Sequence, residues 1–424
     1  MCRISRISTR PHSVVNDLGH GACQFVNFRY VLQVLMRFSH LFDDLRGSQI
    51  TGKFSGAILV VISVLCLLTG SAFSEDNDWP SFRGNAQLTG VASGSLPDHL
   101  EPLWTSEVGE GIESTATVAG GIVFVGGLDG FLYAFSLENG KEIWKYQATD
   151  EIKSSPSISG NAVFFGDEAG VFHAVDSRSG EALWTFQSGG GITSSAAVSG
   201  DRVLFGSYDQ FLYCLSSARG ELIWKLETEG YVHGTPALVD SVALIAGCDG
   251  QMRCVRLSDG SERHRIPLGD YVGASAAVMG SRAFVGTFGS QVLCVDLAAA
   301  EVAWRYEHEK QHFPFYASPA ATNEIVVVAG RDKMVHALNP MTGDLLWIYR
   351  DRARLDASPV IVGGRIFVAT MDGVLLELNK NTGKPVWEFV AGSSFVASPS
   401  VANERLLIGT TDGFLYCFGK KAKE

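Results

Sequence analysis

One short tryptophan-containing phrase recurs along the chain at a nearly constant interval, and this feature constrains the fold more than any other. Examples of the phrase are "NGKEIWKYQ", "SGEALWTFQ", "RGELIWKLE" and "TGKPVWEFV". Its tryptophans are Trp104, Trp144, Trp184, Trp224, Trp304, Trp347 and Trp387, and His264 stands where the series lacks a member. Apart from the doubled step across His264, successive tryptophans lie 40 to 43 residues apart. A fixed period of this length indicates a chain built from repeated units.

Each unit contains four short apolar runs separated by turn residues. A unit opens on a stretch such as "STATV" or "ASPVI", with Ser or Thr second, and continues with runs such as "IVFVGG" and "FLYAF" before the tryptophan phrase. Runs of five or six residues bounded by Gly, Asp or Asn are typical of β-strands joined by tight turns. The turn aspartates Asp129, Asp209, Asp249, Asp332, Asp372 and Asp412 are therefore interpreted as turn-forming residues.

Four strands repeated eight times predict an all-β, eight-bladed β-propeller. A proline stands in the first strand of five units, which suits an innermost edge strand; these are Pro156, Pro236, Pro319, Pro359 and Pro399. The last unit ends near Phe418 after only three strands, and "EPLWTSEV" supplies a tryptophan strand without the other three. We therefore expect residues 101–108 to pair with the strand at Phe414–Phe418, so that the N-terminal strand completes the last blade and closes the ring.

The seven tryptophans are expected to form a structural girdle. A tryptophan at one fixed place in each outer strand can wedge between neighbouring blades and bury on the order of 200 Å² of ring surface. The glycine four residues before it allows the preceding turn to close without a Cβ. On this interpretation His264 is the irregular member, and we expect it to accept tryptophan with little loss of stability.

The spacing A-x-D-x-x-x-G-x-x-x-W, seen at Ala174, Asp176, Gly180 and Trp184, resembles the tryptophan-docking repeat of the PQQ-like propellers. That family includes quinoprotein alcohol dehydrogenases and BamB-type outer-membrane assembly propellers. The resemblance covers residues 79–418 and implies the fold. It does not decide the activity, because one fold serves both enzymes and scaffolds.

No catalytic, metal-binding or cofactor-binding residue is predicted. The adjacent cysteine pair that the resemblance would imply for a quinone site is absent, as are the G-x-S-x-G, C-x-x-C and H-E-x-x-H motifs. His308 and His312 are four residues apart but lie in an expected loop, where this spacing does not align metal ligands. Cys214, Cys254, Cys294 and Cys417 occupy strand positions held by alanine in other repeats, and Cys248 is expected to be an exposed thiol in a turn.

The connections between blades differ from one repeat to the next, and two of them have the composition of a binding surface. The first holds Phe313, Phe315 and Tyr316, and the second holds Arg350, Arg352 and Arg354. Aromatic and arginine side chains are enriched where proteins bind one another. The alternative is that these arginines are solvated and paired with Asp351 and Asp356.

The N-terminal part of the chain indicates export. Residues 54–74 carry no charge and include the apolar run "ILVVISVLCLL". We assign residues 1–74 to a signal peptide or a retained N-terminal anchor with an extension upstream of it, and residues 75–424 to the propeller. The formal net charge is −11, and residues 1–53 carry seven Lys or Arg against three Asp or Glu. The propeller is therefore strongly acidic, which argues against binding of nucleic acid.

These features lead to one functional hypothesis with two alternatives. The first is a non-catalytic propeller of the periplasm or cell envelope that binds a protein or peptide, associated with the membrane if the N-terminal segment is retained. The alternatives are a PQQ-dependent oxidoreductase and a propeller that binds carbohydrate or another small ligand. The sequence argues against PQQ but does not separate the first hypothesis from the last.

Overall fold

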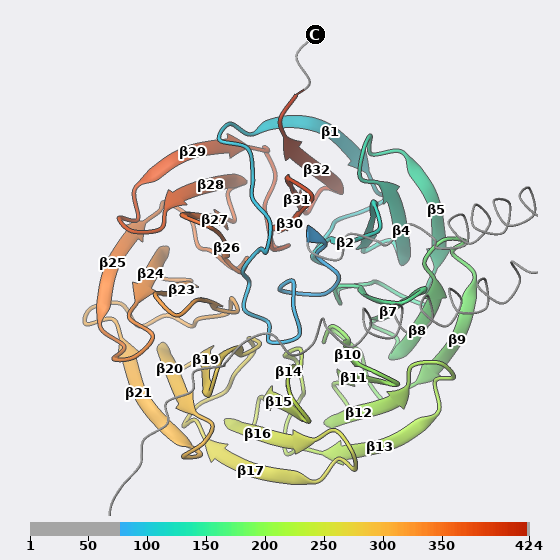
Figure 1. Ribbon diagram of the computed structural model, residues 1–424, viewed down its shortest axis with the longest axis horizontal. Helices are drawn as coiled ribbons and strands as arrows, with labels where there is room; N and C mark the ends of the chain where they lie inside the picture. Colours follow the sequence, from blue (N-terminus) through green and yellow to red (C-terminus); the bar gives the residue numbers. More distant parts are fainter. Residues whose placement is uncertain (1–76, 422–424) are drawn as a thin grey trace, which may run out of the picture. The chain divides into compact units, whose positions relative to one another are not determined.

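The structure is a computed structural model that describes residues 77–421. These residues form strands β1 to β32 and contain no α-helix. The strands make eight sheets of four antiparallel strands each. Figure 1 shows the sheets as blades arranged around a central axis, with the tryptophan-bearing strands at the outer wall. The predicted eight-bladed, all-β propeller is confirmed, whereas the predicted signal or anchor in residues 1–74 lies outside the described residues.

The strands have the following bounds, from the innermost to the outermost strand of each blade. Blades 1 to 3 contain β2 (Thr117–Ala119), β3 (Ile122–Gly126), β4 (Phe131–Ser136) and β5 (Glu142–Gln147); β6 (Ser157–Ser159), β7 (Ala162–Gly166), β8 (Val171–Asp176) and β9 (Ala182–Gln187); and β10 (Ala197–Ser199), β11 (Arg202–Gly206), β12 (Phe211–Ser216) and β13 (Leu222–Glu227). Blades 4 to 6 contain β14 (Ala237–Val239), β15 (Val242–Ala246), β16 (Gln251–Arg256) and β17 (Glu262–Pro267); β18 (Ala277–Met279), β19 (Arg282–Gly286), β20 (Gln291–Asp296) and β21 (Glu301–Glu307); and β22 (Ala320–Ala321), β23 (Val326–Ala329), β24 (Met334–Leu338) and β25 (Leu345–Arg350). Blades 7 and 8 contain β26 (Val360–Val362), β27 (Arg365–Ala369), β28 (Val374–Asn379) and β29 (Pro385–Val390); and β30 (Ser400–Ala402), β31 (Arg405–Gly409), β32 (Phe414–Gly419) and β1 (Glu101–Glu107).

Blade 8 is assembled from the two ends of the propeller. Its strand order is β1-β32-β31-β30, and β1 pairs antiparallel with β32. The register places Glu107 opposite Phe414 and Pro102 opposite Phe418. The predicted closure of the ring by residues 101–108 is confirmed. Pairing the two terminal segments removes the exposed strand edges that an open ring would leave.

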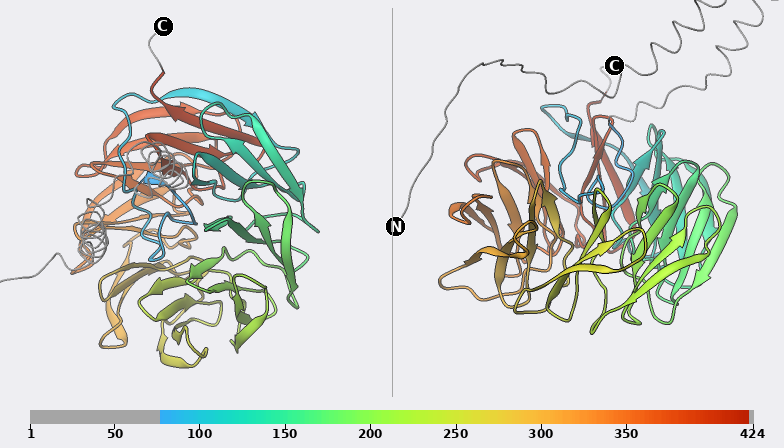
Figure 2. Two further views of the ribbon diagram at one scale, coloured as in Figure 1. Left: turned by 45° about the vertical axis from the view of Figure 1, so that its right-hand side comes forward. Right: turned by 60° about the horizontal axis from the view of Figure 1, so that its bottom comes forward.

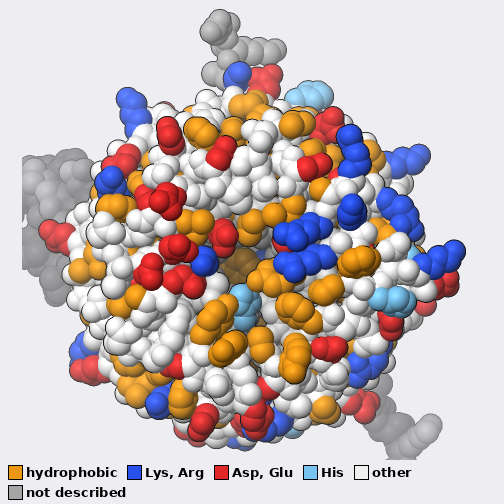
Figure 3. Space-filling model, turned by 180° about the vertical axis from the view of Figure 1, so that it is seen from behind, with side chains coloured by type: hydrophobic (Ala, Val, Ile, Leu, Met, Phe, Trp, Pro, Cys, Tyr) orange, Lys and Arg blue, Asp and Glu red, His pale blue; other side chains and the backbone are white. Residues whose placement is uncertain are grey.

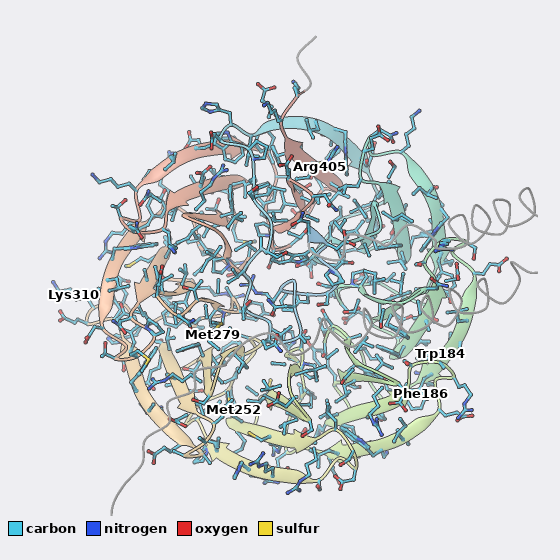
Figure 4. The ribbon with its side chains drawn as sticks, viewed as in Figure 1. Trp184, Phe186, Met252, Met279, Lys310 and Arg405 are labelled. Atoms are coloured by element: carbon cyan, nitrogen blue, oxygen red, sulfur yellow. The ribbon has the colours of Figure 1, made fainter. Side chains whose placement is uncertain are left out.

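The tryptophans dock each blade onto the next one. The indole N–H of Trp184 donates to the carbonyl of Ser217, and that of Trp224 donates to Leu257, both at 3.0 Å and both in the following blade. A Cβ added at Gly260 would lie 2.6 Å from the Trp224 ring, closer than real Cβ atoms approach. Figure 4 shows Trp184 on the outer part of the ring. Six docks have a glycine that accommodates the ring of the preceding blade and also closes its own turn: Gly140, Gly180, Gly220, Gly260, Gly343 and Gly383.

The dock between blades 4 and 5 lacks the tryptophan itself. His264 takes the tryptophan position of blade 4, and in blade 5 the docking glycine is replaced by Ala300. Ala300 keeps the left-handed conformation of the glycines, with φ of 56°. Its Cβ therefore lies where the ring of a tryptophan would come. The two irregular residues belong to the same dock, so we now expect tryptophan at position 264 to fit only if residue 300 is glycine.

A ring of hydroxyl groups joins the blades near the axis. In each unit the second residue of the opening pair is Ser or Thr, and in seven of the eight units its backbone amide donates to the hydroxyl of the equivalent residue in the next blade. Seven such bonds, from Thr115–Ser155 to Ser358–Ser398, have lengths of 2.8–3.2 Å. These bonds explain the recurrence of Ser or Thr, because each hydroxyl satisfies a buried amide that would otherwise lack a partner.

Residues 77–92, which we call the N-terminal strap, run across the inner ends of the blades. The strap accepts hydrogen bonds from one innermost-strand amide in each of six blades, namely Val118, Ile158, Leu238, Val278, Ala321 and Ile361. Figures 1 and 2 show it crossing the centre of the ring on one side. Arg83 is 1% exposed and donates to the carbonyls of Pro319 and Pro359. The five prolines, expected within the innermost strands, each lie one residue before such a strand. The strap covers much of the free edge of these strands.

The turn aspartates have the structural role expected of them. Asp209 accepts a hydrogen bond from the amide of Phe211 at 3.1 Å and from the hydroxyl of Tyr213 at 2.7 Å. Asp332 similarly bonds the amide of Met334 and the ring of His336. Each carboxylate therefore fixes its own hairpin turn to the following strand.

The strand cysteines Cys214, Cys254, Cys294 and Cys417 are buried and unpaired, as expected. Cys248 differs from the expectation because it is half-buried, and its Sγ lies 3.9 Å from the carbonyl oxygen of Val272. Burial raises the pKa of the Cys248 thiol. Its turn packs against the next blade connection, which the sequence of the turn does not indicate.

Candidate functional site

Every connection from one blade to the next ends in the same three-residue pattern, which we call rim, anchor and channel positions. The anchors are all apolar and at most 1% exposed: Ile112, Ile152, Ile192, Val232, Val272, Phe315, Leu355 and Phe395. Each packs where an inner strand ends in a small residue; a Cβ added at Gly286, for example, would lie 2.5 Å from the Phe315 side chain. The residue before each anchor is the rim position, and the residue after it lines the central channel.

The channel positions surround a central hollow of about 140 Å³. They are Glu113, Lys153, Thr193, His233, Gly273, Tyr316, Asp356 and Val396, one from each blade connection. The hydroxyl ring lines the same hollow, and so does Phe82 of the N-terminal strap. The strap therefore closes the channel on its side, and the blade connections surround the opposite mouth. We call the side with the blade connections the loop face.

A polar network crosses the channel between blades that are distant in the sequence. The hydroxyl of Tyr208 lies 2.7 Å from Nδ1 of His233, and the hydroxyl of Tyr316 lies 3.5 Å from its Nε2. Burial lowers the pKa of His233. Arg331 stacks over Tyr316 at 4.6 Å from the ring centre and forms a two-pronged pair with Asp356 at 2.9 and 3.0 Å. These pairs hold the channel side chains in fixed positions.

The six predicted binding residues are found in different environments. Phe313 is 46% exposed, and with Arg350 it lines a surface hollow of about 300 Å³. Arg352 is exposed, and Arg354 lies 3.5 Å from Asp356 while its side chain stays 49% exposed. Phe315 is a buried anchor and is not available to a partner without rearrangement. Tyr316 lies in the channel, so the predicted set combines surface, core and channel residues.

The loop between β21 and β22, which holds three of these residues, runs from the outer wall to the axis. Figure 4 shows Lys310 near its start at the periphery of the ring, and Tyr316 near its end lines the channel. Nδ1 of His308 accepts hydrogen bonds from the amides of Lys310 and Gln311, and Nδ1 of His312 pairs with Glu307 at 2.9 Å. The two histidines therefore stabilise the conformation of the loop.

The loop face carries further aromatic residues that the sequence analysis did not select. Tyr231 and Tyr271 stand at rim positions and are 51% and 62% exposed. Tyr231 stacks on Tyr208 with ring centres 5.1 Å apart. Figure 3 shows hydrophobic side chains beside a central hollow, Asp and Glu gathered on one side of it, and Lys and Arg on the other. The sequence could have indicated these tyrosines through the position before each anchor. The anchor is apolar in every repeat, whereas the residue before it differs from one repeat to the next.

The central channel is small for an organic cofactor such as PQQ. The central hollow of about 140 Å³ is smaller than the roughly 300–1,000 Å³ of typical small-molecule pockets. Arg331, the arginine nearest to the channel network, is already paired with Asp356. Among residues 77–421 no group of three or more His, Cys, Asp or Glu side chains is placed to hold a metal ion.

The same residues include no helix long and apolar enough to cross a membrane.

Comparison with solved structures shows the same fold in a BamB protein, a methanol dehydrogenase and a designed protein. BamB from Moraxella catarrhalis superimposes with a TM-score of 0.66 at 21% identity, covering 77% of this chain and 99% of that one. A europium-containing methanol dehydrogenase gives 0.71 at 12% identity, covering 82% and 99%. The computationally designed Ika8 protein gives 0.67 at 15% identity, covering 76% and 100%. At these identities the similarity shows the fold alone. A search of curated protein sequences finds no match.

The sequence of almost the whole described propeller matches the sequence model of one protein family. It matches in four overlapping segments, residues 100–195, 168–268, 249–363 and 352–421. These segments contain the tryptophan docks, the anchors and the channel positions of all eight blades. The chain therefore belongs to the family of PQQ-like propellers described as outer membrane protein assembly factor BamB.

Proposed function

We propose that the protein is an exported β-propeller without catalytic activity, which binds a protein or peptide in the cell envelope through its loop face. The observation that carries this proposal is the set of exposed aromatic side chains on the loop face, which are Tyr231 and Tyr271 at rim positions and Phe313 in the next connection. Large exposed aromatic residues on a rigid frame are typical of protein-binding sites. The strap closes the opposite mouth, so the loop face is the accessible entrance to the channel.

Two further features support the location in the envelope. The family is described as an outer membrane protein assembly factor, and the uncharged segment 54–74 has the composition of an export signal. If this segment is retained, it would also attach the propeller to the membrane. The small polar channel supports binding without a quinone cofactor.

The proposal can be tested by photo-crosslinking in the native envelope. A photoreactive phenylalanine analogue is placed at Tyr231 or Tyr271, and the matched control places it at Val386. Val386 is 63% exposed but lies on β29 at the outer wall. We expect a discrete crosslinked protein from the rim positions only, identified by mass spectrometry. Equal crosslinking from Val386, or none from the rim, would contradict a binding role for the loop face.

A charge-reversal variant tests the arginines separately. Replacing Arg350, Arg352 and Arg354 by Glu should abolish capture of the crosslinked partner and leave the melting temperature unchanged. Exposed charges contribute little to folding, whereas an arginine at an interface can contribute several kcal/mol to binding. Unchanged capture would place the partner site elsewhere on the loop face.

Ligand titration separates the binding proposal from the alternatives. We expect no rise in melting temperature with PQQ and calcium, and no dye-linked oxidation of alcohols. A rise that follows RT ln(1 + [L]/Kd) would assign the protein to the oxidoreductases instead. Soluble oligosaccharides that displace the crosslinked partner would favour a carbohydrate-binding propeller.

A further inference from the structure

We propose that the loop face recognises a charge-polarised peptide segment, with basic residues at one end, apolar or aromatic residues in the middle and acidic residues at the other end. This inference rests on the proposed function of the loop face and specifies the chemistry of its partner. It follows from the order in which acidic, aromatic and basic side chains occur around the mouth of the channel.

The acidic sector lies on blades 1 and 2. The connection into blade 1 contributes Glu110 and Glu113, and the connection into blade 2 contributes Asp150 and Glu151. The one basic side chain at a channel position here, Lys153, is paired with Glu151 at 3.0 Å and with Glu168 at 3.7 Å. Its charge is therefore already compensated, and the sector as a whole attracts a basic group.

The aromatic sector follows on blades 4 to 6. Tyr231 and Tyr271 stand in consecutive rim positions, and Phe313 belongs to the next connection. The ring of Tyr231 is held in place by stacking on the ring of Tyr208. Between this sector and the acidic one lies the connection "SGGGIT" at 188–193. It carries no charge and no large exposed side chain, so an extended chain can cross it closely.

The basic sector lies on blades 6 and 7. Arg350 and Arg352 are exposed and form no ion pair among residues 77–421. The carboxylates beside them have other partners: Asp356 holds Arg331, and Asp351 accepts hydrogen bonds from Tyr349 and from two backbone amides. Four arginines, Arg331, Arg350, Arg352 and Arg354, stand against the two carboxylates Asp351 and Asp356, so the sector is net positive and attracts an acidic group.

The three sectors together define the partner. Opposite charges on the two sides of the aromatic sector favour a segment of complementary order over one whose charges alternate or are uniform. Figure 3 shows the two charged sides facing each other across the central hollow. Neither a uniformly acidic peptide nor a uniformly basic one would satisfy both sides at once.

The inference is tested with two synthetic peptides of identical composition. The block peptide has three lysines, two phenylalanines within a glycine spacer, and three glutamates in that order. The control peptide has the same residues with lysine and glutamate alternating. We expect the full-length protein to bind the block peptide at least tenfold more tightly by fluorescence anisotropy at low salt. The difference should shrink as ionic strength rises, because exposed charges are screened.

Charge reversal on the protein provides the matched controls. Reversing the basic sector (Arg350→Glu with Arg352→Glu) or the acidic sector (Glu110→Lys with Asp150→Lys) should each weaken the block peptide about tenfold. Combining the two reversals should restore binding, because the block peptide can then bind in the opposite direction. Equal affinity for both peptides, no binding of either peptide, or a combined variant as weak as the single-sector variants would overturn the inference.

These results are separable from the test of the proposed function. If rim positions crosslink a partner in the envelope but sector reversals leave that partner bound, the loop face is a binding site and the charge order is wrong. If the block peptide binds as expected but no rim crosslink forms in the envelope, the recognition chemistry is right and the proposed cellular role is wrong.

Discussion

The irregular dock between blades 4 and 5 allows a quantitative test of how tryptophans hold the ring together. At the regular docks a glycine with positive φ faces the tryptophan ring of the preceding blade, and an added Cβ would lie 2.6 Å from the ring at Gly260 and 2.8 Å at Gly180. At the irregular dock Ala300 supplies that Cβ, with φ of 56°. His264→Trp alone should therefore overpack the site, whereas His264→Trp combined with Ala300→Gly should rebuild a regular dock.

The magnitudes follow from the neighbouring docks. Overpacking typically costs about 1–3 kcal/mol, so the free energy of unfolding should fall by about 2 kcal/mol in His264→Trp. Ala300→Gly should be nearly neutral, because relief of the left-handed alanine, about 1 kcal/mol, offsets the greater entropy of glycine in the unfolded chain. In the double variant about 60 Å² of additional buried ring gives about 1.5 kcal/mol. A hydrogen bond equivalent to that of Trp224 adds about 1 kcal/mol.

The double variant should therefore be about 2.5 kcal/mol more stable than the natural chain, with a coupling energy of about 4.5 kcal/mol between the two positions. Urea denaturation followed by far-UV circular dichroism measures this without interference from the fluorescence of the added tryptophan. A His264→Trp variant as stable as the natural chain, or a coupling energy below about 0.5 kcal/mol, would refute the assignment of His264 and Ala300 to one dock.

Three other predictions use the same measurement. Trp184→Ala should lower the free energy of unfolding by about 3 kcal/mol, and Gly220→Ala, which would overlap with the same ring, should be destabilising as well; a neutral effect of both would show that the girdle does not support the ring. Deleting residues 75–110 should abolish cooperative unfolding, because it removes both β1 and the strap; a truncated chain with an unchanged melting temperature would contradict this. Burial lowers the pKa of His233, so the unfolded state binds its proton at higher pH and stability should fall as pH drops below about 6.5; His233→Gln should flatten that dependence, and an unchanged pH profile would exclude His233 as its source.

The sequence was sufficient to predict the features that depend on one repeat or on the number of repeats. The strands and turns follow from local apolar runs and from aspartates such as Asp209, because each hairpin is stabilised within a few residues. The closure of blade 8 also followed from counting strands, because a ring cannot leave one blade with three. The same holds for Cys214 and its equivalents, whose burial follows from a repeat position otherwise occupied by alanine.

The binding residues were predicted only in part, because exposure depends on packing across a blade. Phe313 and Phe315 have the same side chain and lie two residues apart, yet one is at the surface and the other is a core anchor. The difference arises because Gly286 leaves a space that only the anchor position can reach. Tyr231 and Tyr271 were not selected, since a single tyrosine in a loop is not distinctive until its neighbours in the ring are known.

The repeat by itself determined the propeller, its blade count and its closure, because these follow from local periodicity along the chain. Only the tertiary structure decided which residues meet at the axis. His233 and Tyr316 are 83 residues apart in the chain, and the strap reaches six blades from one short segment. The pairing of His264 with Ala300 is likewise invisible within either repeat. Such contacts depend on the curvature of the closed ring, which brings distant repeats to a common centre and places each blade against the next.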